Sequence, residues 1–290
     1  MLKRYIKHVC LFLTKLSGGI FLENLILKNG DTLTYHIYGH GKPVLLIHGF
    51  TSFGLSWNPQ LTSLIYSGYQ VIIPDLRGHG LSAEVDVIVT VDDLSGDMFQ
   101  LLDHLDLSEN VVVCGLSLGG MIAQKMALTD PSRLKGIVIA NSTPNFNEVI
   151  HLKVCEAWIS LFQQSNGAQL RLEKNWDKLV NQSFRDSVYG KSVYDSWQKV
   201  LAKRSGESFI NIAKGMLDFD VRQQLDQIKI PVQVITSTQD EIFDQSKSQH
   251  IHKSIQESRL SVLEDSGHIS NLDNPLEFNS VLLKFLKDIM

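Results

Sequence analysis

Ser117 lies at the centre of the segment GLSLG (115–119), which has the pattern G-x-S-x-G. An apolar segment at 110–114 precedes it, and residues 121–128 are rich in helix-forming types. A serine between a strand and a helix must occupy a tight, strained turn, and the flanking glycines let neighbouring backbone approach without a Cβ clash. The start of the helix also directs backbone N–H groups toward this position, where they stabilise negative charge. The pattern therefore predicts a nucleophilic serine.

A serine hydroxyl is a weak nucleophile near neutral pH, so it needs a base, and the base needs an orienting carboxylate. Where a serine occupies such a turn, the acid and the histidine follow it along the chain in that order. Asp240 and His268 each follow a predicted strand, so both are expected at the carboxyl edge of the sheet. We therefore predict Asp240 as the orienting acid and His268 as the general base. Glu241 and Asp244 are the alternatives for the acid.

Two backbone amides are expected to stabilise the negative charge that develops on a carbonyl oxygen under attack. One belongs to the residue after the serine, Leu118, and the other to the loop after an early apolar strand. That loop reads HGF at 48–50, and because its glycine lets the chain turn sharply, the N–H of Phe50 is the predicted second donor. His268 fits the role of base better than His48. We interpret His48 as a structural residue that joins loops through its two ring nitrogens.

Strand-like and helix-like segments alternate from residue 22 onward, which is typical of an α/β sheet. The runs VLLIH, VIIPD, VVVCG and IVIAN are apolar throughout, as expected for strands covered on both faces. Either Asn29-Gly30 or Gly30-Asp31 predicts a hairpin turn between the first two strands. We predict eight strands, at 22–27, 32–38, 44–47, 70–74, 110–114, 136–140, 232–235 and 260–263.

Residues 144–228 break this alternation, because they contain helical windows and no strand candidate. The windows lie at 150–162, 176–184, 193–202 and 209–219. A helical insertion of this length indicates a cap over the edge of the sheet. The predicted organisation is an N-terminal extension (1–21), a core built from 22–143 and 229–290, and a helical cap (144–228).

Two sets of cap side chains have the chemistry to contact a ligand. The aromatic set consists of Trp158, Phe162, Trp176 and Trp197. The basic set consists of Arg171, Lys174 and Arg185, which have the charge to meet a substrate carboxylate. At helical spacing the aromatic set is more typical of a core than of a pocket lining. For the basic set, a solvated helix face is the interpretation that we favour.

Further motifs accompany the serine in a fixed order: HGF at 48–50, DLRGHG at 75–80, GLSLGG at 115–120, Asp240, and Gly-His at 267–268. Together they resemble the α/β-hydrolase-fold superfamily of serine hydrolases, over the chain from about residue 22 to the C-terminus. The resemblance implies an eight-stranded, mostly parallel sheet with helices on both faces, a helical cap inserted between strands six and seven, and no cofactor. It also implies that DLRGHG forms a tight structural turn near the site.

Two longer segments, GLSLGGMIAQ (115–124) and GHISNLDNPLEFN (267–279), resemble the branch that holds 3-oxoadipate enol-lactonases and related esterases. A serine at 117 argues against the dehalogenase and epoxide-hydrolase branches, which need a carboxylate nucleophile. The residue after His268 is not Trp, which disfavours the carbon–carbon bond hydrolases of aromatic meta-cleavage products. The predicted function is hydrolysis of a small-molecule carboxylic ester or lactone through an acyl-enzyme. The alternatives are acyl transfer or perhydrolysis with the same triad, and a small-molecule receptor of this fold.

The composition is that of an ordinary globular protein. Of 290 residues, 43% are hydrophobic and 20% are charged, which excludes a disordered chain. A net charge of −4 gives no reason to expect a nucleic-acid partner, and no glycine-rich nucleotide-binding motif is present. His250 and His252 do not share a helix face, so we predict no metal site there. The sequence leaves the oligomeric state open.

Three widely spaced cysteines, Cys10, Cys114 and Cys155, predict neither a disulfide framework nor a zinc cluster. They favour a reducing, cytoplasmic location, and Cys114 is interpreted as a small buried hydrophobe. Residues 1–15 combine basic side chains with an apolar run of only five residues, too short for a typical signal peptide or a membrane span. We therefore favour a packed or frayed extension and no stable membrane insertion. Weak membrane-surface contact, a partner-binding helix and an export signal are the alternatives.

Overall fold

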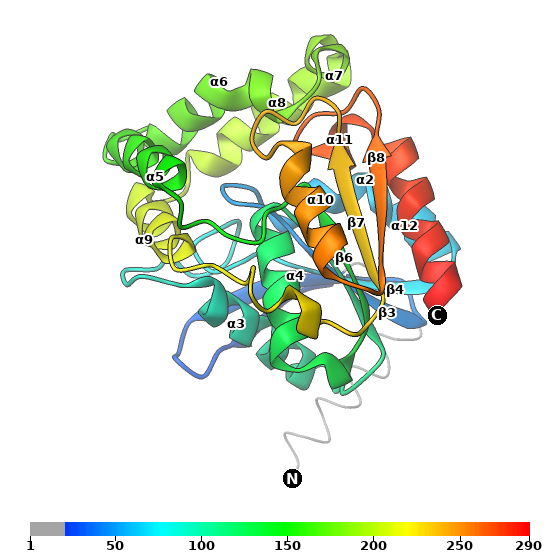
Figure 1. Cartoon of the computed structure of the whole chain (residues 1–290). Helices are drawn as coiled ribbons and strands as arrows, with labels where there is room; N and C mark the ends of the chain where they lie inside the picture. The colour runs from blue at the N-terminus through cyan, green and yellow to red at the C-terminus, as the bar shows by residue number, and fades with distance from the viewer. Residues whose placement is uncertain (1–20) are drawn as a thin grey trace.

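Eight strands form one sheet in the computed structural model, which describes residues 21–290 (Figure 1). The order across the sheet is β1-β2-β4-β3-β5-β6-β7-β8. The pairs β1–β2 and β2–β4 are antiparallel, and the other neighbours are parallel. The strands are β1 (Phe21–Ile26), β2 (Thr32–Tyr38), β3 (Lys42–Ile47), β4 (Tyr69–Pro74), β5 (Val111–Leu116), β6 (Leu134–Ala140), β7 (Val232–Ser237) and β8 (Ser258–Leu263). All eight predicted strands are confirmed.

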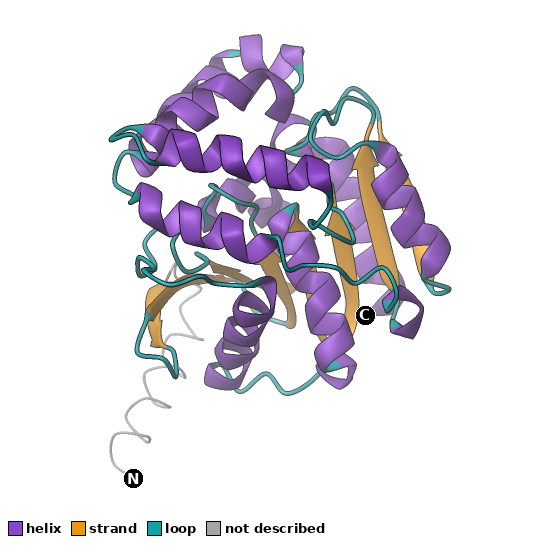
Figure 2. Cartoon of the chain, turned by 60° about the vertical axis from the view of Figure 1, so that its left-hand side comes forward, coloured by secondary structure: helices purple, strands orange, loops and turns teal. Residues whose placement is uncertain are grey.

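Helices cover both faces of the sheet (Figure 2). One apolar core lies between the sheet and α2 (Asn58–Tyr66) with α12 (Pro275–Ile289). The larger core lies against α3 (Val91–His104), α4 (Leu118–Thr129) and α10 (Gln245–Ser254). Every residue of β5 is buried, and so are residues 44–47 of β3, 71–74 of β4 and 136–140 of β6, which confirms that the continuous apolar runs are strands covered on both sides. The short elements are η1 (Gly54–Trp57), η2 (Pro131–Arg133), η3 (Leu225–Gln227) and α11 (Ser270–Asp273).

The cap consists of helices inserted between β6 and β7, as the resemblance implied. They are α5 (Val149–Phe162), α6 (Gly167–Leu179), α7 (Gln182–Asp186), α8 (Val188–Leu201) and α9 (Gly206–Met216). The predicted helical window at 176–184 is wrong, because two helices meet inside it. Val180 is extended, and the side chain of Asn181 caps α7 by accepting a hydrogen bond from the Phe184 N–H at 2.7 Å.

The two chain segments that join the cap to the core lie side by side. The N–H of Phe146 donates to the carbonyl of Phe219 at 2.8 Å, and the N–H of Val221 donates to the carbonyl of Pro144 at 2.9 Å. These bonds flank an antiparallel bridge between Asn145 and Asp220. The chain therefore enters and leaves the cap at one place.

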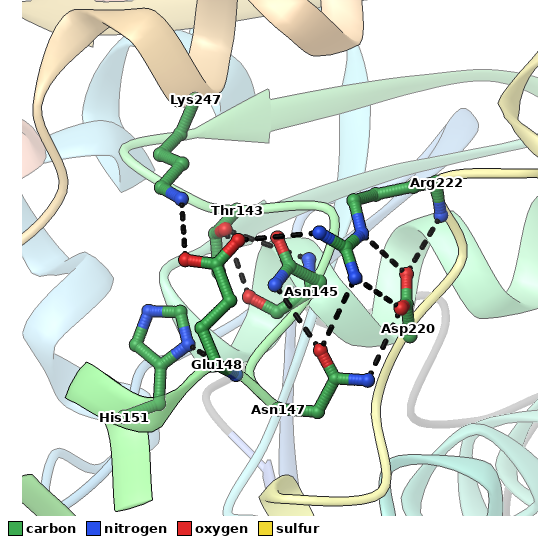
Figure 3. A network of polar contacts seen from close by, with 8 residues as sticks. All are labelled: Thr143, Asn145, Asn147, Glu148, His151, Asp220, Arg222 and Lys247. Atoms are coloured by element: carbon green, nitrogen blue, oxygen red, sulfur yellow. Dashed lines mark hydrogen bonds and ion pairs between the residues drawn. The ribbon is translucent and has the colours of Figure 1, made fainter. Parts of the chain in front are cut away.

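A network of polar side chains surrounds this junction (Figure 3). Asp220 accepts hydrogen bonds from Arg222 at 2.6 Å and from the Asn147 amide at 3.1 Å. The hydrogen bond from Arg222 lowers the pKa of Asp220 to about 2. Glu148 pairs with Arg222 and with Lys247 of α10, each at 3.2 Å. The network thus joins both cap connections to a helix of the core.

Some predictions concern parts of the chain that the structure does not describe. The N-terminal extension at 1–21, apart from Phe21, lies outside the described residues, as does Cys10. Within residues 21–290, no helix combines the length and the apolar character needed to cross a bilayer. Cys114 is fully buried in the middle of β5, which confirms its interpretation as a core residue.

Candidate active site

Ser117 lies in a strained turn between β5 and α4. Its backbone has φ +55° and ψ −115°, a conformation that residues with a side chain rarely adopt. A Cβ atom on Gly115 would lie 2.0 Å from the Gly119 carbonyl oxygen, and one on Gly119 would lie 2.1 Å from the Ile47 carbonyl oxygen. The glycines on either side of the serine therefore permit backbone contacts that a side chain would prevent.

This close contact leads to a stability prediction. Gly119→Ala should lower the free energy of unfolding by about 1–3 kcal/mol, because the backbone of the β3 loop must move away from the new methyl group. Gly96 of α3 is the matched control, since a Cβ there would meet no atom within 4 Å. Gly96→Ala should stabilise the protein by about 0.5–1 kcal/mol through helix propensity alone. Urea denaturation measures both changes, and a shift of the same sign in both variants would contradict the prediction.

Asp240 and His268 are brought together after the ends of β7 and β8. Nδ1 of His268 lies 3.0 Å from each carboxylate oxygen of Asp240, and the Asp240 side chain is fully buried. Asp240 also accepts hydrogen bonds from the N–H groups of Ile242 at 2.8 Å and Phe243 at 3.0 Å. These donors fix the carboxylate so that it orients the imidazole ring.

The two alternative acids lie elsewhere. Asp244 caps α10 by accepting a hydrogen bond from the Ser246 N–H at 2.8 Å. The hydrogen bond from Ser246 lowers the pKa of Asp244. Glu241 is exposed. Of the three candidate acids, only Asp240 is placed against His268.

Asn141 is a site residue that the sequence analysis missed. It follows β6 with φ +45°, and its amide donates to Asp240 at 3.0 Å and to the Ser237 hydroxyl at 2.8 Å. Its side-chain oxygen Oδ1 accepts from the Ser270 hydroxyl at 2.6 Å. The available signal was an Asn directly after a buried strand, at the sheet edge where the other site residues were expected.

Two buried histidines hold the loop that contains Phe50. The His48 ring contacts the Gly49 carbonyl oxygen through Nδ1 at 2.8 Å and accepts from the Leu76 N–H through Nε2 at 3.0 Å. Nε2 of His79 accepts from the Thr51 N–H at 3.1 Å. Burial lowers the pKa of both imidazoles, which favours the neutral form that can accept these bonds. The interpretation of His48 as a structural residue is confirmed, and so is the structural role of the DLRGHG turn.

Ser117 and His268 line the same pocket, which lies between the core and the cap. Phe50 also lines it, whereas the side chain of Leu118 is fully buried in the core behind the serine. The aromatic set of the cap divides between two environments. Trp158 and Trp197 line the pocket, while Phe162 and Trp176 are buried in the core.

The interpretation of the basic cap residues as a solvated face is wrong for Arg171. Lys174 is exposed and Arg185 is partly exposed, but Arg171 is only 6% exposed and lines the pocket with Ser117. Arg171 lies on the buried side of α6, together with Leu172 and Trp176. Among residues 21–290, no group of three or more His, Cys, Asp or Glu side chains is arranged to hold a metal ion.

Known proteins match this chain over most of its length. Residues 42–275 match the family model for the alpha/beta hydrolase fold. The chain belongs to the α/β-hydrolase fold family. The 3-oxoadipate enol-lactonase 2 of Acinetobacter baylyi is 30% identical over 262 residues, which cover 88% of this chain and 93% of that protein.

Solved structures agree with this family assignment. A hydrolase from Pseudomonas aeruginosa superposes with a TM-score of 0.81 at 26% identity, over 91% of this chain and 98% of the other. The enol-lactonase from Burkholderia xenovorans superposes with a TM-score of 0.84 at 22% identity, over 91% and 100% of the two chains. At 22% sequence identity, the match to the Burkholderia xenovorans enol-lactonase supports only the shared α/β-hydrolase fold.

Proposed function

We propose that this protein hydrolyses a carboxylic ester or lactone of a small molecule through an acyl-enzyme on Ser117. One observation carries the proposal: the strained Ser117 turn and His268 line one pocket, and His268 is hydrogen-bonded to the buried carboxylate of Asp240. The similarity to an enol-lactonase at 30% identity supports ester-type substrates. A serine in the nucleophile position also suits acyl transfer to water.

In the first half-reaction, Asp240 accepts the Nδ1–H of His268, which leaves Nε2 free to take the proton of Ser117. Oγ then attacks the substrate carbonyl carbon and forms a tetrahedral intermediate. We assign the N–H groups of Phe50 and Leu118 as the donors to its oxyanion. Leu118 is suited to this because it is the first residue of α4, where the N–H has no acceptor within the helix.

The first half-reaction ends when the leaving group departs, and water completes the second half-reaction. The imidazolium of His268 protonates the leaving alkoxide oxygen as the carbon–oxygen bond breaks, and the acyl group stays on Ser117. A water molecule then gives a proton to the same ring nitrogen and attacks the acyl carbon. Collapse of the second intermediate releases the carboxylic acid and returns the proton to Ser117. For a lactone, the alcohol and the acid belong to one product molecule.

A fluorophosphonate probe tests the nucleophile directly. The probe should form a stoichiometric adduct, which tryptic mass spectrometry locates on Ser117. A parallel screen of 4-nitrophenyl esters, thioesters and lactones should identify substrates whose hydrolysis the probe abolishes. An adduct on another residue, or hydrolysis that persists in fully labelled protein, would contradict the proposal.

A further inference from the structure

Arg171 is a buried arginine whose charge the surrounding residues leave uncompensated. Its Nη1 donates to the Thr51 hydroxyl at 2.6 Å, and its buried Nε has no hydrogen-bond partner among the described residues. None of the described residues that line the pocket with it is an Asp or a Glu. A buried charge is costly unless it is paired, so this arrangement calls for an explanation.

Two other arginines of the described chain, one buried and one partly buried, have acidic partners. Arg77 is as buried as Arg171, and it pairs with Asp97 at 2.6 Å and Asp31 at 3.2 Å. Arg204 of the cap pairs with Glu84 of the core at 3.1 Å. The fold thus provides carboxylates for arginines that it buries for structural reasons. Beside Arg171 there is a pocket and no acidic side chain among the described residues that line it.

Two neighbouring aromatic rings, those of Trp158 and Phe50, lie close to the guanidinium group of Arg171. The group lies 4.3 Å from the centre of the Trp158 ring and 5.1 Å from that of Phe50, which stabilises the cation in part. Burial lowers the pKa of Arg171 to about 9, so the group is charged at neutral pH. The N–H donors of the guanidinium lie in its plane, and only one of them, on Nη1, has a side-chain acceptor among the described residues, so a further acceptor would bind in that plane.

We propose that Arg171 binds a carboxylate on the substrate, so that the preferred substrate is an ester or lactone bearing one carboxylate apart from the scissile carbonyl. This inference rests on the proposed function and names its substrate class. A planar carboxylate matches the in-plane donors of a guanidinium group, and one negative charge balances one positive charge. A doubly charged phosphate would leave a buried negative charge. The apolar walls, which include Trp197, Ile242 and Phe243, suit a hydrocarbon spacer between the two groups.

A second role for Arg171 must be separated from this one. The Thr51 hydroxyl that accepts from Arg171 also donates to the Phe50 carbonyl oxygen at 2.7 Å. Arg171 therefore contacts the loop whose N–H we assign to the oxyanion. If it acted through that loop alone, its loss would slow charged and neutral esters equally.

A pair of matched substrates makes the distinction. We compare mono-4-nitrophenyl adipate with its ω-methyl ester, which has the same chain but no charge, and repeat the pair with glutarate and pimelate. Arg171→Met should lower kcat/KM for the best half-ester by roughly 100-fold and for its methyl ester by less than about 3-fold. Arg185→Met removes a cap arginine outside the pocket lining and should leave both values unchanged.

Two additional measurements guard the test against misfolding and against failure of the proposed function. Arg171→Lys keeps the positive charge but lacks the planar set of N–H donors of a guanidinium group. This variant should retain part of the preference for the half-ester. Adipate itself should raise the Tm of the wild-type protein and not that of Arg171→Met, a result that needs no turnover.

The outcomes separate the two proposals. Hydrolysis that depends on Ser117 but shows no preference for any half-ester, or equal losses on both substrates, would overturn the role of Arg171 and leave the proposed function standing. Stabilisation by adipate that depends on Arg171, in a protein that hydrolyses no ester, would support the carboxylate site and overturn the hydrolase proposal.

Discussion

Ser117→Ala should lower kcat for a short 4-nitrophenyl ester by at least about 10⁴-fold, because the variant has no atom that can form the acyl-enzyme. Ser117 is 8% exposed, and its side chain accepts no capping bond from α4, so removal of the hydroxyl should leave the fold intact. Steady-state kinetics and a urea denaturation curve measure the two expectations together.

Ser142 provides the matched control for this variant. It is a fully buried serine whose hydroxyl donates to the Ser117 carbonyl oxygen at 2.7 Å, so it contacts the same turn without facing the pocket. Ser142→Ala should cost about 1 kcal/mol of stability and far less activity than Ser117→Ala. Undiminished turnover in a contaminant-free preparation of Ser117→Ala would end the acyl-enzyme hypothesis.

Asp240→Asn should reduce kcat by roughly 10⁴-fold, the second of the large effects. An amide at this position can donate to Nδ1 of His268, which stabilises the tautomer with the proton on Nε2 and leaves no base for Ser117. The oxygen of the new side chain can still accept from the N–H groups of Ile242 and Phe243, which should hold the loop, while its NH2 group cannot accept the hydrogen bond that Asn141 donates to Asp240.

Asp244→Asn is the control for charge removal in the same loop. Asp244 caps α10, and asparagine caps a helix about as well as aspartate does, so this variant should keep near wild-type kcat. Equal activity losses in Asp240→Asn and Asp244→Asn would show that loop charge, and not contact with His268, explains the effect.

The sequence predicted the sheet well because its signals are local. Each buried strand is a short apolar run, and the order of such runs fixes an α/β sheet. Ser117 was predictable for the same reason, since the glycines around it are needed for contacts only a few residues away or with the adjacent loop. The pairing of Asp240 with His268 needed only the rule that both follow strands of one sheet.

Two of the misjudged features depend on contacts between distant parts of the chain, and the third is local. Whether Arg171 faces solvent or the pocket is decided by how α6 packs on the core, and its helical pattern alone is compatible with both. Asn141 acquires its role through Asp240, Ser237 and Ser270, which lie about a hundred residues or more away in the sequence. The break before α7 is a local feature that a helical pattern conceals, because a single asparagine there acts as a cap.

The paired segments at the base of the cap have an evolutionary consequence. Since Pro144 and Val221 are joined by a hydrogen bond, the two ends of the insertion nearly coincide in space. A module with coincident ends can be exchanged by recombination, lengthened or lost while the path of the remaining polypeptide is preserved. New selectivity can then arise in the exchanged piece without a change in Ser117, Asp240 or His268, because all three residues lie outside it.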